Sequence, residues 1–570
     1  MKKILSIIAP LLLLAASCSD SYLKDVNTDK SKATSMDPNA LLTTALLQTY
    51  GDFGLMDTYR SYITGFTQHI AGGWNVTRYA GSVSADNNEM SKLWDEYYNV
   101  GIKNLVDGIA NSEDKPNVNA VLRIHRVYMM SILTDVYGDI PCFQAGKGYT
   151  DGISNPVYDS QKDIYDFFFE ELEACQDQLD ASKDHVTGDV SGFAGDVKEW
   201  QKFANSLRMR FAMRISDVDP DKARAEFEAA LATGKYMTSA SDDAFIRYID
   251  APFTLYEGAK DLDFRVNALS EVFYGQDKTS PTLICATLYN QLQNSADPRL
   301  FRICRHYNFA TRNDNAYDLT GIHDFTEEVT AWEVSSGLGA HPCHVGQAWY
   351  SSSAWVDCPS LDQLPEFQKL AESDSRYTSD NHHNRMIRPF LSLDLENPAA
   401  PGIMMTYAEQ ELLLAEAKVN GWSVDGTVES HYKAGVKAAM QLLNQRYLSA
   451  DRVISETEMD TFLEANPLGT NPKESINTQA WILHLTNPVE AWANLRRADY
   501  PVLEDRRNIT DTGFADGDSD MTTPVRLKYP KMEETYNTVN YKAAISREPL
   551  NGSDNWHTRV WWDKNEGRYE

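Results

Sequence analysis

Apolar residues recur at helical spacing along much of the chain, and the clearest case is the stretch 404–447. Thr406 and Glu409 have the spacing of a capping box at a helix N-terminus, and Gly421 follows the last turn. Steps of three and four place five residues of this stretch on one helical face: Met405, Ala408, Leu412, Ala415 and Val419. A second helical run ends at Tyr447, and small residues on its face predict close antiparallel packing of the two helices. Such a pair cannot bury its apolar face alone, so we expect further helices stacked on it.

The same periodicity predicts helices on both sides of a long middle region. N-terminal helices are expected near Trp94 and over 39–49, 53–70, 120–137, 160–179, 199–215 and 223–232. Further on, Ser455 with Glu458, and Asn487 with Pro488, mark the starts of two more helices. The chain therefore divides into a helical half over 37–237 and a second helical segment over 401–505.

The middle region, 238–400, is rich in Ser, Gly, Asn, Asp and Pro, and we expect only short helices in it, such as one over 282–295. From 331 to 357 three tryptophans stand among serines and glycines: Trp332, Trp349 and Trp355. Long loops in a folded chain are usually functional, and this one has too many aromatic residues to be disordered. We therefore expect 238–400 to carry a ligand-binding face, and the tail 506–570 to be loop-rich.

The N-terminus predicts export. Two lysines precede an apolar run over 4–16, which is too short to span a bilayer, and the run ends in Leu14-Ala15-Ala16-Ser17-Cys18. Small residues before a cysteine resemble a bacterial lipobox. The resemblance implies a signal peptide over 1–17, diacylglycerol on Cys18 and a tether over 18–36. An ordinary secretory signal that happens to contain a cysteine is the alternative.

Charge and motifs restrict the function. The net charge of −29 repels phosphate, which argues against a nucleic-acid partner. The sequence contains none of GxSxG, GxGxxG, GxxxxGK[ST] or HExxH, so no catalytic residue or cofactor is predicted.

Two clusters contain residue types that bind metals. His341, Cys343 and His344 lack a second ligand pair at fixed spacing, and the acidic run 516–520 lacks the Gly and Glu of a calcium loop. We therefore predict no metal site. Among the cysteines, Cys343 with Cys358 and Cys285 with Cys304 are close enough in sequence to bridge, although buried free thiols are the simpler interpretation.

Motifs spread over nearly the whole chain resemble SusD/RagB-family surface lipoproteins of Bacteroidetes. They are Val136–Pro141, Tyr158–Gln161, Trp200–Arg214, Asp297–Leu300, Tyr407–Gly421, Trp492–Pro501 and Arg559–Asp563. The resemblance implies a mostly α fold: a right-handed superhelix of four degenerate tetratricopeptide-like helix pairs with a large loop-rich insertion. It also implies a lipid-anchored, surface-exposed position on the outer membrane, with Asp20 as a reduced export signal. The implied partner is a SusC-like TonB-dependent transporter.

Aromatic residues supply the candidate binding site. Flat aromatic rings cover the apolar face of a sugar, and polar side chains pair with its hydroxyl groups. The predicted ligand contacts are Trp74, Asn75, Arg78, Tyr79, Trp332, Trp349 and Trp355. For each aromatic residue, loop-anchoring core is the alternative, whereas Arg496 and Arg497 are expected to form buried structural contacts.

The leading hypothesis is therefore a lipoprotein that binds a nutrient, most often a glycan in this family, and does not react with it. Two alternatives stay open: a surface glycoside hydrolase of helical architecture, and a helical-repeat scaffold that binds only protein.

Overall fold

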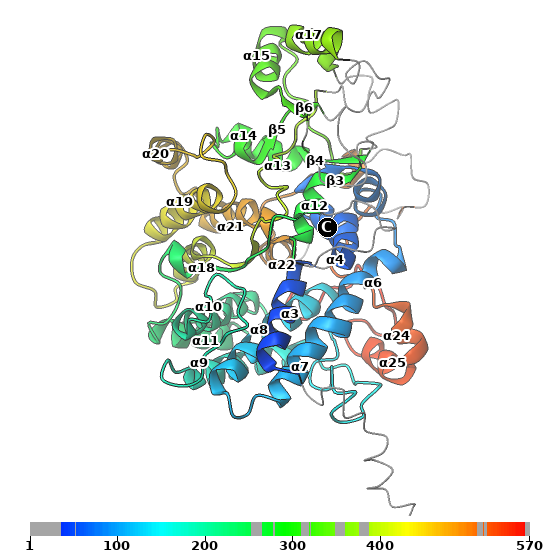
Figure 1. The fold of residues 1–570 in the computed structure, drawn as a ribbon, viewed down its shortest axis with the longest axis vertical. Coiled ribbons are helices and arrows are strands. Elements are labelled where there is room, and N and C mark those ends of the chain that lie inside the picture. Colours follow the sequence, from blue (N-terminus) through cyan, green and yellow to red (C-terminus); the bar gives the residue numbers. More distant parts are fainter. Residues whose placement is uncertain are drawn as a thin grey trace, which may run out of the picture.

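The computed structural model describes residues 36–51, 53–251, 265–277, 280–308, 319, 321–347, 359–374, 387–509, 517 and 521–564. The signal peptide and five further residues discussed above lie outside these ranges: Cys18, Asp20, Trp349, Trp355 and Cys358. The fold is mostly helical, as predicted, and its few strands are short (Figure 1).

The first half of the chain forms consecutive helices that pack on one another in chain order from α7 to α11. The α-helices are α3 (Pro38–Gly51), α4 (Phe53–Thr58), α5 (Thr64–Phe66), α6 (Asn87–Glu96), α7 (Lys103–Ala110), α8 (Pro116–Tyr137), α9 (Gln161–Gln178), α10 (Val197–Arg214) and α11 (Pro220–Ala232). Between them lie the π-helical turns η1 (Tyr59–Ile63), η2 (Val76–Gly81) and η3 (Tyr97–Ile102), and the 3-10 turn η4 (Ala240–Asp242) follows.

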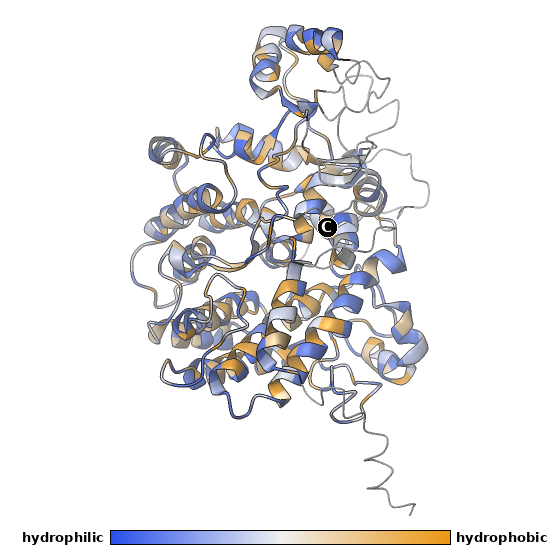
Figure 2. Ribbon diagram, in the orientation of Figure 1, coloured by the Kyte–Doolittle hydropathy of each residue, from blue (hydrophilic) through white to orange (hydrophobic). Residues whose placement is uncertain are grey.

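The C-terminal helices return to this stack, because α18 packs on α10 as well as on α19 and α21. They are α18 (Tyr407–Val419), α19 (Val428–Arg446), α20 (Glu456–Ala465), α21 (Pro472–Leu483), η8 (His484–Thr486), α22 (Pro488–Ala498), α23 (Arg506–Ile509), α24 (Lys531–Tyr536) and α25 (Thr538–Ser546). Body helices carry both hydrophilic and hydrophobic residues in Figure 2, as amphipathic helices do. The tail 506–570, which was expected to be loop-rich, contains the three short helices α23, α24 and α25.

Short elements fill the region between the two helical parts. The helices are α12 (Ala268–Tyr274), α13 (Ala286–Asn294), α14 (Leu300–Ile303), α15 (Thr326–Ser336), η5 (Leu361–Gln363) and α17 (Pro365–Ser373). The strands are β1 (Ile70–Gly72), β2 (Ala244–Ile246), β3 (Gly275–Asp277), β4 (Ser280–Ile284), β5 (Cys304–Arg305), β6 (Tyr307–Asn308), β7 (His323–Asp324), β8 (Phe390–Leu391) and β9 (Gly402–Met405). The helix predicted over 282–295 is therefore wrong in its first turn, because β4 pairs antiparallel with β1, β3 and β8.

The predicted helix pair is confirmed as α18 and α19, although Met405, which was expected on the first helix, is the last residue of strand β9. The Thr406 side chain accepts a hydrogen bond from the Glu409 backbone N–H at 3.2 Å, and Gly421 has a φ of +77°. The second half of the expected capping box is not formed, because Arg210 binds the Glu409 carboxylate through two nitrogens at 2.6 Å each. A buried charged pair between α10 and α18 thus outcompetes a local cap.

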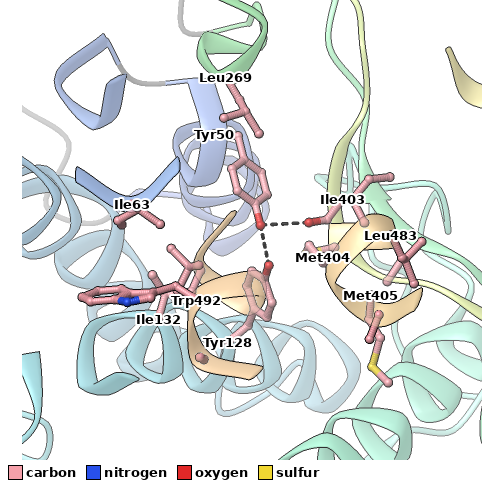
Figure 3. Close-up of a cluster of buried hydrophobic side chains, with 14 of the residues drawn as sticks. Tyr50, Ile63, Tyr128, Ile132, Leu269, Ile403, Met404, Met405, Leu483 and Trp492 are labelled. Carbon is pink, nitrogen blue, oxygen red and sulfur yellow. Dashed lines mark hydrogen bonds between the residues drawn. The ribbon is translucent and has the colours of Figure 1, made fainter. Parts of the chain in front are cut away.

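Buried polar contacts join distant parts of the chain. In Figure 3 the Tyr50 hydroxyl on α3 donates to the Ile403 carbonyl at 2.8 Å and lies 2.6 Å from the Tyr128 hydroxyl on α8. Arg497 on α22 binds Glu416 on α18 at 2.7 Å, which is the buried structural ion pair expected of it. Among the described residues, no helix has the length and apolar character needed to cross a bilayer.

A small lobe with α15 and α17 stands at the upper end of the molecule in Figure 1, and η5 packs on α17 within it. We call it the upper lobe. It has its own core of six buried residues: Phe325, Val329, Leu361, Leu364, Phe367 and Ile387. This core is much smaller than the hydrophobic core of the helical body.

Candidate ligand-binding site

Trp74 begins a short helical segment that continues into η2 and follows directly on β1. Gly72 and Gly73 make the turn between strand and helix, with φ values of +74° and +63° that favour glycine. The Thr77 hydroxyl then donates to the Gly73 carbonyl at 2.8 Å, which fixes the first turn. Trp74 is 36% exposed, in contrast to the buried residues of η2.

The wide π-helical turn brings Trp74, Arg78 and Tyr79 together, and we call these three residues the Trp74 cluster. The Trp74 and Tyr79 rings meet edge to face, with centroids 5.7 Å apart and planes at 88°. The Arg78 guanidinium carbon lies 4.8 Å from the Trp74 ring centroid and 5.6 Å from that of Tyr79. Cation–π and edge contacts of this kind hold an aromatic ring in one orientation.

Buried neighbours support the cluster from below. Tyr79 is 7% exposed, and its ring packs on Tyr62 with centroids 5.7 Å apart. Asn75 is buried and donates to the Ser61 hydroxyl at 3.3 Å, and Ser61 donates to Glu89 at 2.7 Å. Burial raises the pKa of the Glu89 carboxyl above its ordinary value. In this arrangement Trp74 is the outward-facing ring, whereas Asn75 and Tyr79 are buried, and their roles as ligand contacts stay predictions.

The segment 344–347 packs closely against η2. A Cβ atom at position 81 would lie 2.5 Å from the Val345 carbonyl oxygen, so only glycine fits at Gly81. The Thr77 hydroxyl also approaches the Gln347 carbonyl at 3.3 Å, and Arg388 donates to the Gln347 side chain at 3.4 Å. The sequence analysis did not single out Gln347 or Arg388, because their position beside η2 depends on contacts between segments far apart in sequence.

Trp332 belongs to a different part of the molecule. It lies on α15, where a loop was expected, and it is partly buried against the core of the upper lobe. The adjacent Glu333 is 7% exposed, and burial raises the pKa of its carboxyl to about 7. The structure therefore places Trp332 in the upper lobe and the Trp74 cluster on the helical body, and the role of Trp332 as a ligand contact stays a prediction.

The residues considered above as metal ligands or disulfide partners either pair with a neighbouring side chain or are buried thiols. His344 Nδ1 lies 2.6 Å from a carboxylate oxygen of Glu504. Cys285, Cys304 and Cys343 are buried free thiols, and burial raises the pKa of Cys285 to about 12. The Cys285–Cys304 bridge considered from the sequence is thus not formed. Within the described part of the chain, no group of three or more His, Cys, Asp or Glu side chains is placed to hold a metal ion.

Comparisons with known proteins agree with this architecture. A SusD-like family, described as "Starch-binding associating with outer membrane", matches residues 30–341 and 366–530. A solved structure described as a Bacteroidetes AC2a SusD-like protein is 38% identical, with a TM-score of 0.81 over 93% of this chain and 100% of that chain. No curated protein matches the sequence.

Two more solved structures extend the comparison. A chitin-binding protein is 28% identical, with a TM-score of 0.72 over 93% of this chain and 100% of its own. A SusD-like protein from Bacteroides thetaiotaomicron is 19% identical, with a TM-score of 0.65 over 93% of this chain and 99% of its own, and this likeness concerns the fold alone. Since the family match covers most of the sequence, the chain belongs to the SusD-like family, whose description is starch-binding and associated with the outer membrane.

Proposed function

We propose that the protein binds an oligosaccharide at the Trp74 cluster without changing it chemically. The observation that carries the proposal is the exposed Trp74 ring, which is held in place by Arg78 and Tyr79 on a closely packed π-helical turn. π-helical turns are rare and often occur at functional sites.

The chemistry of the cluster suits a sugar. A pyranose ring has an apolar face of C–H groups, which a flat indole covers, and a rim of hydroxyl groups, which a guanidinium can bind. Because the residues beneath Trp74 are buried, the indole loses little conformational entropy when a ligand binds. A ring fixed in this way can cover the apolar face of a sugar at a low entropic cost. The description of the family as starch-binding and of one relative as chitin-binding supports a pyranose ligand.

The N-terminal motif around Cys18 resembles a lipobox, and on this resemblance we extend the proposal to the cell surface. We expect lipid on Cys18 to anchor the protein in the outer membrane, and a SusC-like TonB-dependent transporter to receive the ligand. Fractionation of cells tests the anchor, since replacement of Cys18 by Ser should move the protein out of the membrane fraction. Co-purification of the transporter with the wild-type protein tests the partner.

Calorimetry with starch and chitin oligosaccharides tests binding at Trp74. We expect Trp74→Ala to weaken binding about tenfold, or roughly 1.4 kcal/mol. Tyr149→Ala is the matched control, because Tyr149 is an aromatic residue that is 87% exposed in the loop after α8. Equal affinity in wild type and Trp74→Ala would contradict the site, and release of new reducing ends by the wild-type protein would favour a glycoside hydrolase.

A further inference from the structure

A second site candidate lies away from the Trp74 cluster. A cavity of about 400 Å³ opens between the turn that joins α8 to α9 and the C-terminal segment of the chain. Its walls include Asp139, Gln161, Arg547, Trp561 and Asp563. The volume is in the usual range for a small-molecule site. We call it the Trp561 cavity.

Two adjacent tryptophans have opposite environments at this cavity. Trp562 is fully buried, and its indole N–H donates to the Asp135 carboxylate at 2.9 Å. Trp561 is only partly buried, lines the cavity and is backed by Tyr165, with ring centroids 6.1 Å apart. Pro549 adds further apolar surface to the same walls. The cavity therefore has an aromatic wall, which suits an apolar ligand surface better than water alone.

The polar atoms of the walls are incompletely paired. Gln161 is 1% exposed, and its amide nitrogen donates to the Thr134 carbonyl at 2.7 Å, whereas its Oε1 has no hydrogen-bond partner among the residues that the structure describes. Asp563 is 2% exposed and accepts from Arg559 at 2.8 Å through Oδ1, while its Oδ2 has no partner within the same described ranges. Buried polar atoms in folded proteins are nearly always paired, so each of these oxygens calls for a donor.

Arg547 adds an unpaired donor to these two acceptors. One of its terminal nitrogens donates to the Tyr158 carbonyl at 3.0 Å and lies 3.2 Å from Asp139, while its Nε has no partner in the described part of the chain. A hydroxyl group both donates and accepts hydrogen bonds, so one type of group satisfies the acceptors and the donor. Four basic and three acidic side chains line the cavity, and this near balance favours a neutral ligand over a charged one.

We propose that the Trp561 cavity binds one or two neutral sugar units and is a second carbohydrate site, separate from the Trp74 cluster. The indole of Trp561 covers the C–H face of the sugar. Gln161 Oε1 and Asp563 Oδ2 accept from its hydroxyl groups, and Arg547 donates to it. This site is built from the connection between α8 and α9, the first turn of α9 and the C-terminal segment, and none of its lining residues belongs to the Trp74 cluster.

Saturation-transfer difference NMR on the full chain tests the proposal, with maltose and diacetylchitobiose as probes. In a Trp74→Ala background, at least one probe should still give a signal, and adding Trp561→Ala should reduce that signal at least fivefold. Tyr149→Ala in the same background should leave it unchanged.

Thermal unfolding followed by circular dichroism establishes that each variant is folded. If Trp561→Ala does not fold, Arg547→Ala replaces it, because the Arg547 side chain is 38% exposed and its loss leaves no large hole. The proposal is overturned if the Trp74→Ala protein binds neither probe, or if the folded cavity variant keeps the full signal. Failure of the Trp74 site is a separate result, since it would appear as equal binding by wild type and Trp74→Ala.

Discussion

Two arginine–tryptophan pairs have the same spacing in sequence but lie in different environments. On α22 the Arg496 guanidinium carbon is 4.1 Å from the Trp492 ring centroid, and both residues are buried. On the segment leading into η2, Arg78 is 4.8 Å from the ring of Trp74, which is 36% exposed. In both pairs the arginine follows the tryptophan by four residues, which places them on one face of a helix.

The difference lies in what surrounds each pair. Arg496 also donates to the Val525 carbonyl at 2.8 Å and lies 4.9 Å from the ring of Trp562, so the α22 pair is enclosed by the C-terminal segment. The Trp74 pair is supported on its inner side by Tyr79 and has an accessible outer side. The same two residue types therefore stabilise the fold in one place and form a candidate binding surface in the other.

The largest expected effect comes from breaking the buried pair. Arg496→Ala removes two cation–π contacts and two hydrogen bonds to backbone carbonyls and leaves a hole, so we expect a loss of roughly 3 kcal/mol or more in the free energy of unfolding. Urea unfolding measures this loss. A change below about 1 kcal/mol would show that the enclosed pair contributes no more to stability than an exposed one.

A second prediction concerns pH. Burial lowers the pKa of His125 to about 4 and that of His69 to about 3, below an ordinary value near 6.5. The unfolded chain binds protons at these positions as the pH falls below 6.5, whereas the folded chain does not, so folding stability is lost between pH 6.5 and about 4. At pH 5 each histidine should cost roughly 2 kcal/mol relative to pH 8.

Urea unfolding at pH 8 and pH 5 measures this effect, with His125→Gln as the comparison variant. The variant keeps a hydrogen-bonding side chain opposite Thr49 but does not titrate, so its stability should fall less than that of wild type. Equal losses in the two proteins would be evidence against the prediction. Sugar binding at the Trp74 cluster should persist at pH 5 in the fraction that stays folded, because arginine does not titrate in this range.

The smallest expected effect comes from the exposed pair. Arg78→Ala removes a surface cation–π contact, so we expect less than about 1 kcal/mol of lost stability and a threefold to fivefold loss of sugar affinity. Arg78→Lys keeps the charge and should recover part of the affinity. Unfolding experiments and calorimetry on the same two variants separate these outcomes, and a stability loss as large as that of Arg496→Ala would erase the contrast between the two pairs.

Local signals in the sequence predict much of the helical body correctly. Thr406 and Ser455 cap helices where expected, and Gly421 ends one, because each acts on backbone within three or four residues. The strand β4 was expected to be helical, since a short apolar run does not distinguish the two structures and its pairing with β1 is distant in sequence. Glu409 pairs with Arg210 rather than with its own helix end, and this contact too is between residues far apart in sequence.

The candidate site was harder to predict. The sequence indicated Trp74, Arg78 and Tyr79 as a patch, but the π-helical turn decides which of them faces outward, and this turn depends on packing against Val345. The burial of Asn75 and the partial burial of Trp332 follow from tertiary contacts. Trp561 appeared only as part of a family motif, because its cavity is assembled from segments near residues 139, 161, 547 and 561.

The contact between Tyr50 and Ile403 has a consequence for how the chain is made. The donor and acceptor are 353 residues apart, so α3 can form this hydrogen bond only after the chain has been synthesised through residue 403. Contacts of such long range slow the search for the native state. During synthesis the N-terminal helices therefore lack this buried contact until the returning C-terminal segment reaches them.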